Sequence, residues 1–141
     1  MVSGEIRKNG VRVGFSLEDI LTHTTGSLAH IDQREGPRVG KYHVNLDDLT
    51  AVGVAAIRHA INEADVIIID EIGPMELTST AFIQSVQDAL TAPKTLVATI
   101  HKRASHQLVL EIKSNHASSL LEITYENRDS MPAELARMIS N

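Results

Sequence analysis

The sequence contains no cysteine and no tryptophan, and its two Phe and two Tyr residues make up only 3% of 141 positions. Without cysteine, this chain cannot form disulfide bonds, thiolate-based catalytic sites, zinc–thiolate sites or cysteine-ligated iron–sulfur clusters. So few aromatic rings supply almost no stacking platforms for single-stranded nucleic acid. The hydrophobic core must therefore be built from aliphatic side chains.

Long hydrophobic runs are also missing. The purely apolar runs are no longer than residues 66–69, whereas a membrane helix needs about 20 apolar residues, and residues 1–4 do not begin a signal peptide. Acidic residues outnumber basic ones by 18 to 13, for a net charge of -5. This balance argues against nucleic acid or an anionic membrane as a partner. We expect a single soluble domain over residues 1–141, located in the cytoplasm.

Turn residues and hydrophobic periodicity predict the elements of the first half of the chain. The pair Asn9-Gly10 tolerates positive φ angles at both centres of a type I′ turn, between two segments of alternating character. The expected elements are a β-hairpin over 5–15, a long loop over 22–37, a short strand over 39–44, and a helix over 46–64 that Asn45 caps.

The second half of the chain alternates between strand and helix patterns. Residues 65–71 place four apolar β-branched residues before Asp70 and Glu71, a pattern typical of a strand buried on both faces of a parallel sheet. A helix over 79–90 and a second buried strand over 95–100 predict a right-handed parallel crossover. The sequence therefore predicts an α/β fold with a mostly parallel sheet, flanking helices and an antiparallel hairpin. The remaining expected elements are a helix over 105–113, a strand over 120–124 and a terminal helix from Pro132.

Polar side chains follow three of the predicted strands, where open parallel sheets bind ligands. Four apolar residues followed by Asp70-Glu71 match the second, or Walker B, signature of P-loop nucleotide hydrolases. In that signature the Asp organises Mg²⁺ and the Glu orients or deprotonates the attacking water. The alternative is a pair of acids that only caps the end of a strand. The other two clusters are Thr99 with His101, Lys102 and Arg103, and Glu126 with Asn127, Arg128 and Asp129.

The phosphate-binding signature of the same proteins is not found. Residues 36–42 come close, but they have three residues between the glycines instead of four, and Tyr42 follows Lys41 in place of the Ser or Thr that ligates Mg²⁺. Pro37 also removes one of the backbone N–H groups that such a loop needs. We reject this segment as a phosphate loop. Arg38 and Lys41 remain candidates for contacting an anion, and the alternative is that they are solvated loop charges.

Five segments taken together resemble the thermophile-type nucleoside-triphosphatase family. Each segment is a weak signal alone, but their order and spacing match the family along nearly the whole chain. The segments are Glu5-Ile6-Arg7 with Gly10, Arg12, Gly14 and Phe15, then residues 37–42, residues 66–76, residues 98–103, and residues 126–129.

This resemblance implies a fold like that of small P-loop kinases, with Mg²⁺ and ATP or GTP as ligands, and hydrolysis of the triphosphate to the diphosphate and phosphate. Glu76 has two interpretations: it helps to position metal-bound water, or it is a surface acid that interacts with the start of a helix. The implied catalytic residues are Glu71, Asp70 and Arg103, the implied metal ligand is Asp70, and the implied nucleotide-binding residues are Asp70, Glu71, Gly73, Arg38, Lys41, Thr99, Asn127 and Arg128.

The resemblance also implies that the family's N-terminal strand, phosphate loop and first helix, about 25 to 35 residues, are absent from this sequence. We therefore expect hydrolysis by this chain to be weak or absent. One alternative is a non-enzymatic assembly module that self-associates or binds a complementary N-terminal fragment through an unpaired sheet edge. Another is a receiver-like domain with Asp70 as its phosphoacceptor.

Overall fold

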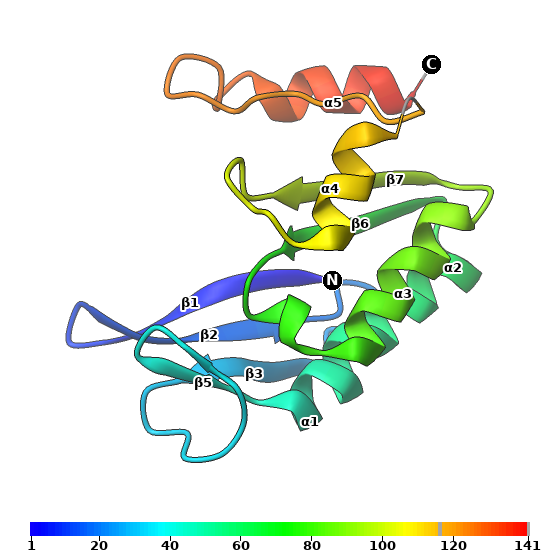
Figure 1. The fold of residues 1–141 in the computed structure, drawn as a ribbon. Helices are drawn as coiled ribbons and strands as arrows, with labels where there is room; N and C mark the ends of the chain where they lie inside the picture. The colour runs from blue at the N-terminus through cyan, green and yellow to red at the C-terminus, as the bar shows by residue number, and fades with distance from the viewer. Residues whose placement is uncertain (116, 141) are drawn as a thin grey trace.

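A seven-stranded sheet runs through the molecule in the order β4-β5-β3-β2-β1-β6-β7 (Figure 1). The structure is a computed structural model that describes residues 1–115 and 117–140. The strands are β1 Val2–Lys8, β2 Val11–Glu18, β3 Thr25–His30, β4 Arg38–Val39, β5 Tyr42–Val44, β6 Val66–Ile72 and β7 Thr95–Ile100. The helical elements are α1 Leu46–Asp48, the π-helical η1 Leu49–Val54, α2 Ala55–Glu63, the 3-10 turn η2 Glu76–Thr78, α3 Thr80–Thr91, α4 Gln107–Ser114 and α5 Met131–Ile139.

Antiparallel pairing dominates this sheet. The pairs β1–β2, β2–β3, β3–β5 and β4–β5 are antiparallel, and the pairs β1–β6 and β6–β7 are parallel. The prediction of a mostly parallel sheet was therefore wrong. The first five strands pair antiparallel because short turns and loops join them, whereas a helical crossover joins β6 to β7 and makes that pair parallel.

The N-terminal hairpin was predicted correctly, but the loop after it was not. Asn9 and Gly10 have φ angles of 51° and 77°, as a type I′ turn requires. Within the predicted loop over 22–37, the structure contains strand β3, which pairs with β2. Leu28 and Ala29, the short apolar break in that polar segment, are 2% and 0% exposed and hold β3 in the core.

Two short strands and an interrupted helix replace the next two predicted elements. The expected strand over 39–44 is split into β4 and β5 by a turn at Gly40, whose φ angle is 61°. The cap was predicted correctly, because Asn45 Oδ1 accepts a hydrogen bond of 3.0 Å from the Asp48 N–H. The helix then continues through η1 into α2.

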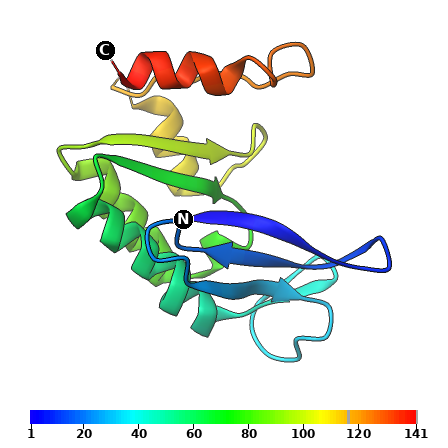
Figure 2. The ribbon, with the colours of Figure 1, turned by 180° about the vertical axis from the view of Figure 1, so that it is seen from behind.

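The helices cover one face of the sheet at β6 and β7, as the two opposite views show (Figures 1 and 2). Ile67 and Ile69 are fully buried, whereas Ile68, which points to the other face, is 37% exposed. The prediction of a β6 strand buried on both faces was therefore wrong. β7 is the last strand of the sheet, and most of its residues are half-buried.

The second half of the chain contains the predicted helices but not the strand predicted over residues 120–124. Ser79 Oγ accepts a hydrogen bond from the Phe82 N–H and caps α3, and Pro132 lies in the first turn of α5. Residues 120–124 form no strand, because their backbone pairs with no other strand in the described structure. None of the helices described here is long and apolar enough to span a bilayer.

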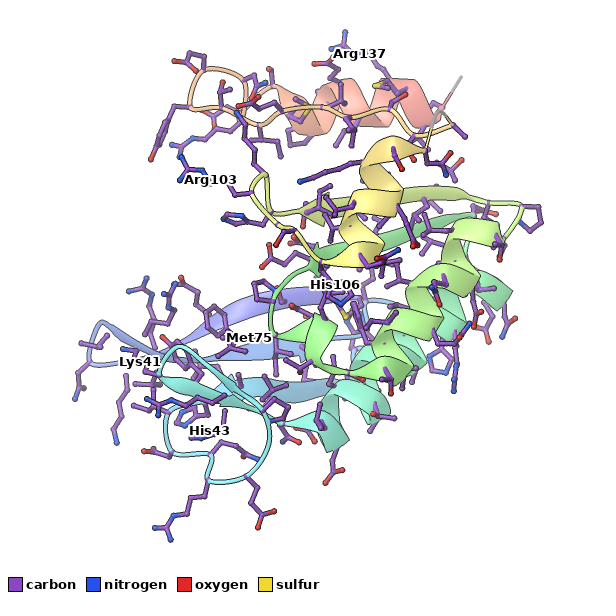
Figure 3. The ribbon with its side chains drawn as sticks, in the orientation of Figure 1. Lys41, His43, Met75, Arg103, His106 and Arg137 are labelled. Atoms are coloured by element: carbon purple, nitrogen blue, oxygen red, sulfur yellow. The ribbon has the colours of Figure 1, made fainter. Side chains whose placement is uncertain are left out.

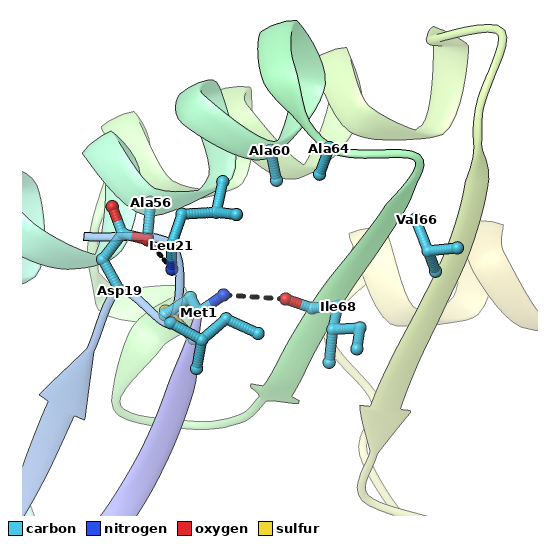
Figure 4. Close-up of a pocket in the computed structure, with 9 residues that line it drawn as sticks. Met1, Asp19, Leu21, Ala56, Ala60, Ala64, Val66 and Ile68 are labelled. Atoms are coloured by element: carbon cyan, nitrogen blue, oxygen red, sulfur yellow. Dashed lines mark hydrogen bonds between the residues drawn. The ribbon is translucent and has the colours of Figure 1, made fainter. Parts of the chain in front are cut away.

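A small, mainly apolar pocket lies between α2, β6 and the segment that follows β2 (Figure 4). Asp19, which is 2% exposed, lies at this pocket. Its Oδ2 is 2.7 Å from His59 Nδ1, and its Oδ1 accepts a hydrogen bond of 3.0 Å from the Leu21 N–H. Burial raises the pKa of Asp19, but the hydrogen bonds from His59 and Leu21 outweigh burial and hold this pKa below its usual value.

We expect Asp19→Asn to lower the free energy of unfolding by about 1–3 kcal/mol at pH 7, because a buried charge-assisted hydrogen bond is lost. A lowered pKa means that the ionised Asp19 stabilises the fold above about pH 4 and that this contribution disappears as the pH falls. Urea denaturation at pH 7 and pH 3 measures the effect, with the exposed Asp32→Asn as the control. An equal deficit at both pH values contradicts this role.

Candidate functional site

The carboxyl ends of β6 and β7 lie side by side because the two strands are parallel neighbours (Figure 3). Asp70 and Glu71 lie in the last part of β6, are half-buried, and are joined by a cis peptide bond. Thr99, near the end of β7, donates a hydrogen bond of 2.6 Å from its Oγ1 to Asp70 Oδ1. The structure therefore brings together two of the three polar clusters that the sequence placed at strand ends.

The turn after β6 brings a third carboxylate to the same place. A side chain on Gly73 would place its Cβ 2.6 Å from Glu71 Oε1 and 2.9 Å from Glu76 Oε2. Both distances are shorter than van der Waals contact, so both carboxylates lie close to the one position that a side chain on residue 73 would occupy. Gly73 is therefore the residue that permits this packing.

Glu76 is a buried acid, and its interpretation as a surface acid at a helix start was wrong. It is 2% exposed. Burial is the main cause that raises the pKa of Glu76 to about 7, and the negative charges of Glu71 and Asp70 raise it further. Met75 and Leu77, the apolar residues on either side, were the signal in the sequence for this burial.

The basic residues after β7 form a tight turn. His101 Nδ1 accepts a hydrogen bond of 3.2 Å from the Arg103 N–H, and Lys102 Nζ lies 2.5 Å from Glu122 Oε1. Arg103 is exposed on the loop that follows the carboxyl end of β7 (Figure 3). Its guanidinium makes no hydrogen bond or ion pair with residues in the described part of the chain, so it is free to meet a ligand.

The cluster at residues 126–129 is a structured turn on the outer side of β7. Asn127 uses both groups of its amide within this turn: Oδ1 accepts from the Thr124 N–H, and Nδ2 donates to the Glu122 carbonyl. The guanidinium of Arg128 lies 5.5 Å from the centre of the Tyr125 ring. Tyr125, which the sequence analysis did not select, is 87% exposed and adds a flat aromatic face to the cluster.

Arg38 and Lys41 lie at the opposite end of the sheet from β7, on the β4–β5 hairpin. Arg38 Nε donates a hydrogen bond of 3.0 Å to the Gly40 carbonyl, and Lys41 Nζ lies 5.5 Å from the centre of the Tyr42 ring. In the sheet order, strands β5, β3, β2 and β1 separate β4 from β6. Arg38 and Lys41 are therefore not neighbours of the ends of β6 and β7 in the sheet.

Comparison with known proteins identifies relatives along the whole chain. Residues 1–136 match a family model described as NTPase. The nucleoside-triphosphatase THEP1 of Thermofilum pendens is 47% identical over 142 residues, a match that covers 100% of this chain and 78% of the relative. The corresponding protein of Methanosarcina barkeri is 45% identical, covering 95% of this chain and 75% of the relative.

A solved structure agrees with these matches. The crystal structure of THEP1 from Aquifex aeolicus superposes with a TM-score of 0.87 at 30% identity, and it covers 99% of this chain and 82% of that one. The similarity extends through the strands that carry Asp70, Glu71 and Thr99. On the family match and these relatives, the chain belongs to the nucleoside-triphosphatase family.

Proposed function

We propose that this chain binds a magnesium–nucleoside triphosphate complex at the ends of β6 and β7 and takes part in its hydrolysis to the diphosphate and phosphate. The observation that carries the proposal is the Asp70–Thr99 hydrogen bond, which joins the two strand ends. An acid and a hydroxyl held together in this way are suited to binding a metal ion and a phosphate oxygen. ATP and GTP are the candidate substrates.

Mg²⁺ suits the donor atoms at this site. The ion prefers oxygen ligands, and it is commonly held by one or two carboxylates together with water and substrate phosphates. Asp70 Oδ1 and Thr99 Oγ1 are such oxygens. The described residues include no group of three or more His, Cys, Asp or Glu side chains arranged to hold a metal. The residues therefore fit an ion that arrives with the nucleotide, and the ion when bound supplies charge neutralisation at the phosphates.

Glu71 is the residue that we assign to water activation. It lies next to Asp70, is half-buried, and its carboxylate accepts no hydrogen bond from another described residue. A free carboxylate at this position can orient a water molecule toward the terminal phosphorus and accept its proton. Gly73 leaves the space that Glu71 occupies.

The exposed cations around the strand ends have separate roles in this proposal. Arg103 offsets the negative charge that develops on the transferred phosphoryl group. Arg128, with Tyr125 beside it, offers a flat surface for the base, and Asn127 shapes the turn that presents it. We give Arg38 and Lys41 no direct contact with the reacting phosphate, because they lie at the far end of the sheet.

We propose that hydrolysis by these 141 residues alone is weak or absent. Phosphoryl transfer depends mainly on positioning and on electrostatic stabilisation of the phosphates. The sequence contains no glycine-rich phosphate-binding signature that would supply a set of backbone N–H groups. A non-enzymatic assembly role is the second candidate, and the outer edge of β7, which pairs with no strand among the described residues, favours it.

Calorimetric titration with ATP or GTP, with and without Mg²⁺, tests the proposed binding. We expect dissociation constants on the order of millimolar for the chain alone, and we expect Asp70→Asn to remove the Mg²⁺-dependent part of the binding. Asp65→Asn is the matched control, because Asp65 is an exposed acid just before the opposite end of the same strand. Equal Mg²⁺ dependence in both variants contradicts the assignment of Asp70.

A further inference from the structure

The loop between β7 and α4 carries Arg103 close to the ends of β6 and β7 (Figure 3). Its backbone is folded on His101. The Arg103 N–H donates a hydrogen bond of 3.2 Å to His101 Nδ1, and the Ala104 N–H donates one of 3.0 Å to the His101 carbonyl. These two bonds form the turn, and the carbonyl groups of Lys102 and Ala104 lie on either side of Arg103.

Lys113, in the last turn of α4, binds both of these carbonyl groups. Its Nζ donates a hydrogen bond of 2.8 Å to the Lys102 carbonyl and one of 3.3 Å to the Ala104 carbonyl. A lysine near the end of a helix commonly interacts with the last carbonyl groups of its own helix. The ammonium group of Lys113 instead reaches back along the chain and holds the backbone on both sides of Arg103.

A second contact to this loop is weaker. Lys102 Nζ lies 2.5 Å from Glu122 Oε1, but the two side chains are 73% and 59% exposed. Ion pairs in water contribute little, because solvent screens the charges and two flexible side chains must be ordered. Lys113 is half-buried, and it makes two hydrogen bonds to backbone atoms. It is therefore the stronger restraint on the loop.

The restraint affects Arg103 in particular. The Arg103 side chain is exposed, so the direction in which it leaves the loop is set by the backbone and not by side-chain packing. A long side chain on a fixed backbone has fewer conformations to lose when it binds an anion than the same side chain on a loose one. A tether on both neighbouring carbonyl groups therefore favours anion binding by Arg103.

We propose that Lys113 is a positioning residue for Arg103: it fixes the loop backbone so that the guanidinium meets the terminal phosphates of a nucleoside triphosphate. Lys113 itself does not touch the nucleotide. The inference rests on the proposed function, because it takes Arg103 as a residue that contacts those phosphates. Loss of Lys113 should therefore have the consequence of losing Arg103 in smaller measure, and only for nucleotides that carry terminal phosphates.

Amide hydrogen exchange on the full chain without nucleotide tests the tether. Lys113→Met keeps the apolar part of the side chain and removes the ammonium group. We expect exchange of the Arg103 and Ala104 N–H groups to become about fivefold to tenfold faster, the effect of one or two lost hydrogen bonds. Unchanged exchange at these two groups overturns the proposal.

Lys94→Met is the matched control. Lys94 is also half-buried, and its Nζ likewise donates to two backbone carbonyl groups, those of Ala60 at 3.3 Å and Ala64 at 2.6 Å. It lies just before the amino end of β7, away from the Arg103 loop. We expect Lys94→Met to leave exchange at residues 103 and 104 unchanged. Faster exchange there in both variants means general loosening of the fold and overturns the proposal.

Titration with ATP and AMP in the presence of Mg²⁺ tests the consequence for binding. We expect Arg103→Gln to weaken ATP binding about threefold to tenfold and Lys113→Met to weaken it about twofold to fivefold, with AMP binding unchanged in both. The double variant should bind ATP as Arg103→Gln does, because Lys113 acts through Arg103. Additive losses, or equal losses for ATP and AMP, overturn the proposal.

Lys113→Arg separates positioning from a loss of stability. Arginine keeps a charged donor at the end of α4, so it should restore ATP affinity to within about twofold of the unchanged chain. ATP affinity as low as in Lys113→Met contradicts the positioning role. If Asp70→Asn removes the Mg²⁺-dependent binding while Lys113→Met leaves ATP affinity unchanged, the proposed function stands and this inference fails. Unchanged ATP affinity in Arg103→Gln also overturns it, because Lys113 then has no phosphate contact to position.

Discussion

Glu71→Gln should lower the rate of nucleoside triphosphate hydrolysis by about 10²- to 10⁴-fold, the usual contribution of a positioned general base. Glutamine keeps the size of the side chain but cannot accept the proton from the attacking water. Affinity for the magnesium–nucleotide complex should change little, because Asp70 and Thr99 keep their hydrogen bond. The effect is therefore expected in kcat and not in KM.

Phosphate release over long incubations measures this rate, because turnover by the chain alone is expected to be slow. Glu63→Gln is the control, since Glu63 is an exposed acid at the end of α2. If Glu71→Gln retains the rate of the unchanged chain, another group activates the water. Appreciable Mg²⁺-dependent turnover by the chain alone would instead contradict the expectation of weak activity.

Glu76→Gln should change how the stability of the fold depends on pH. The pKa of Glu76 is raised to about 7 in the folded chain by burial and by the neighbouring acids, against about 4.3 for an unperturbed glutamate. The unfolded chain therefore releases this proton at lower pH than the folded chain. The contribution of Glu76 to the free energy of unfolding is therefore largest below about pH 4. It decreases as the pH rises and levels off above pH 7.

The size of this effect is about 4 kcal/mol, since each unit of pKa difference corresponds to about 1.4 kcal/mol. Glutamine carries no charge at any pH, so the variant should gain roughly this amount relative to the unchanged chain between pH 4 and pH 8. Denaturant unfolding at several pH values measures the gain, and the exposed Glu111→Gln is the control. A difference that does not vary with pH means that Glu76 titrates normally in the folded chain.

The elements that the sequence predicted well are those with strong local signals. The Asn9-Gly10 turn fixes a hairpin by its own backbone geometry, and Ser79 with the apolar spacing after it fixes α3. The strand β6 and its closing acids were also found, because β-branched runs are distinctive. The Asp70–Thr99 contact follows from the parallel pairing of two such strands.

The elements that the sequence did not predict depend on distant partners. β3 has a polar composition, and only its pairing with β2 and the burial of Leu28 make it a strand. Residues 120–124 have strand-forming side chains but no paired neighbour, so they form no strand. The burial of Glu76 likewise depends on how the turn after β6 folds back, and its apolar neighbours Met75 and Leu77 were only a weak local signal for it.

The helix α5 has a further consequence for how the chain opens. Met131 is its one buried residue in the described part of the chain, and residues 119–123 before it are exposed. Opening α5 therefore exposes little new apolar surface and costs only a small part of the global free energy of unfolding. We therefore expect the C-terminal region to open as a separate cooperative unit, which a protease can reach while the core around Phe82 and Ile57 stays folded.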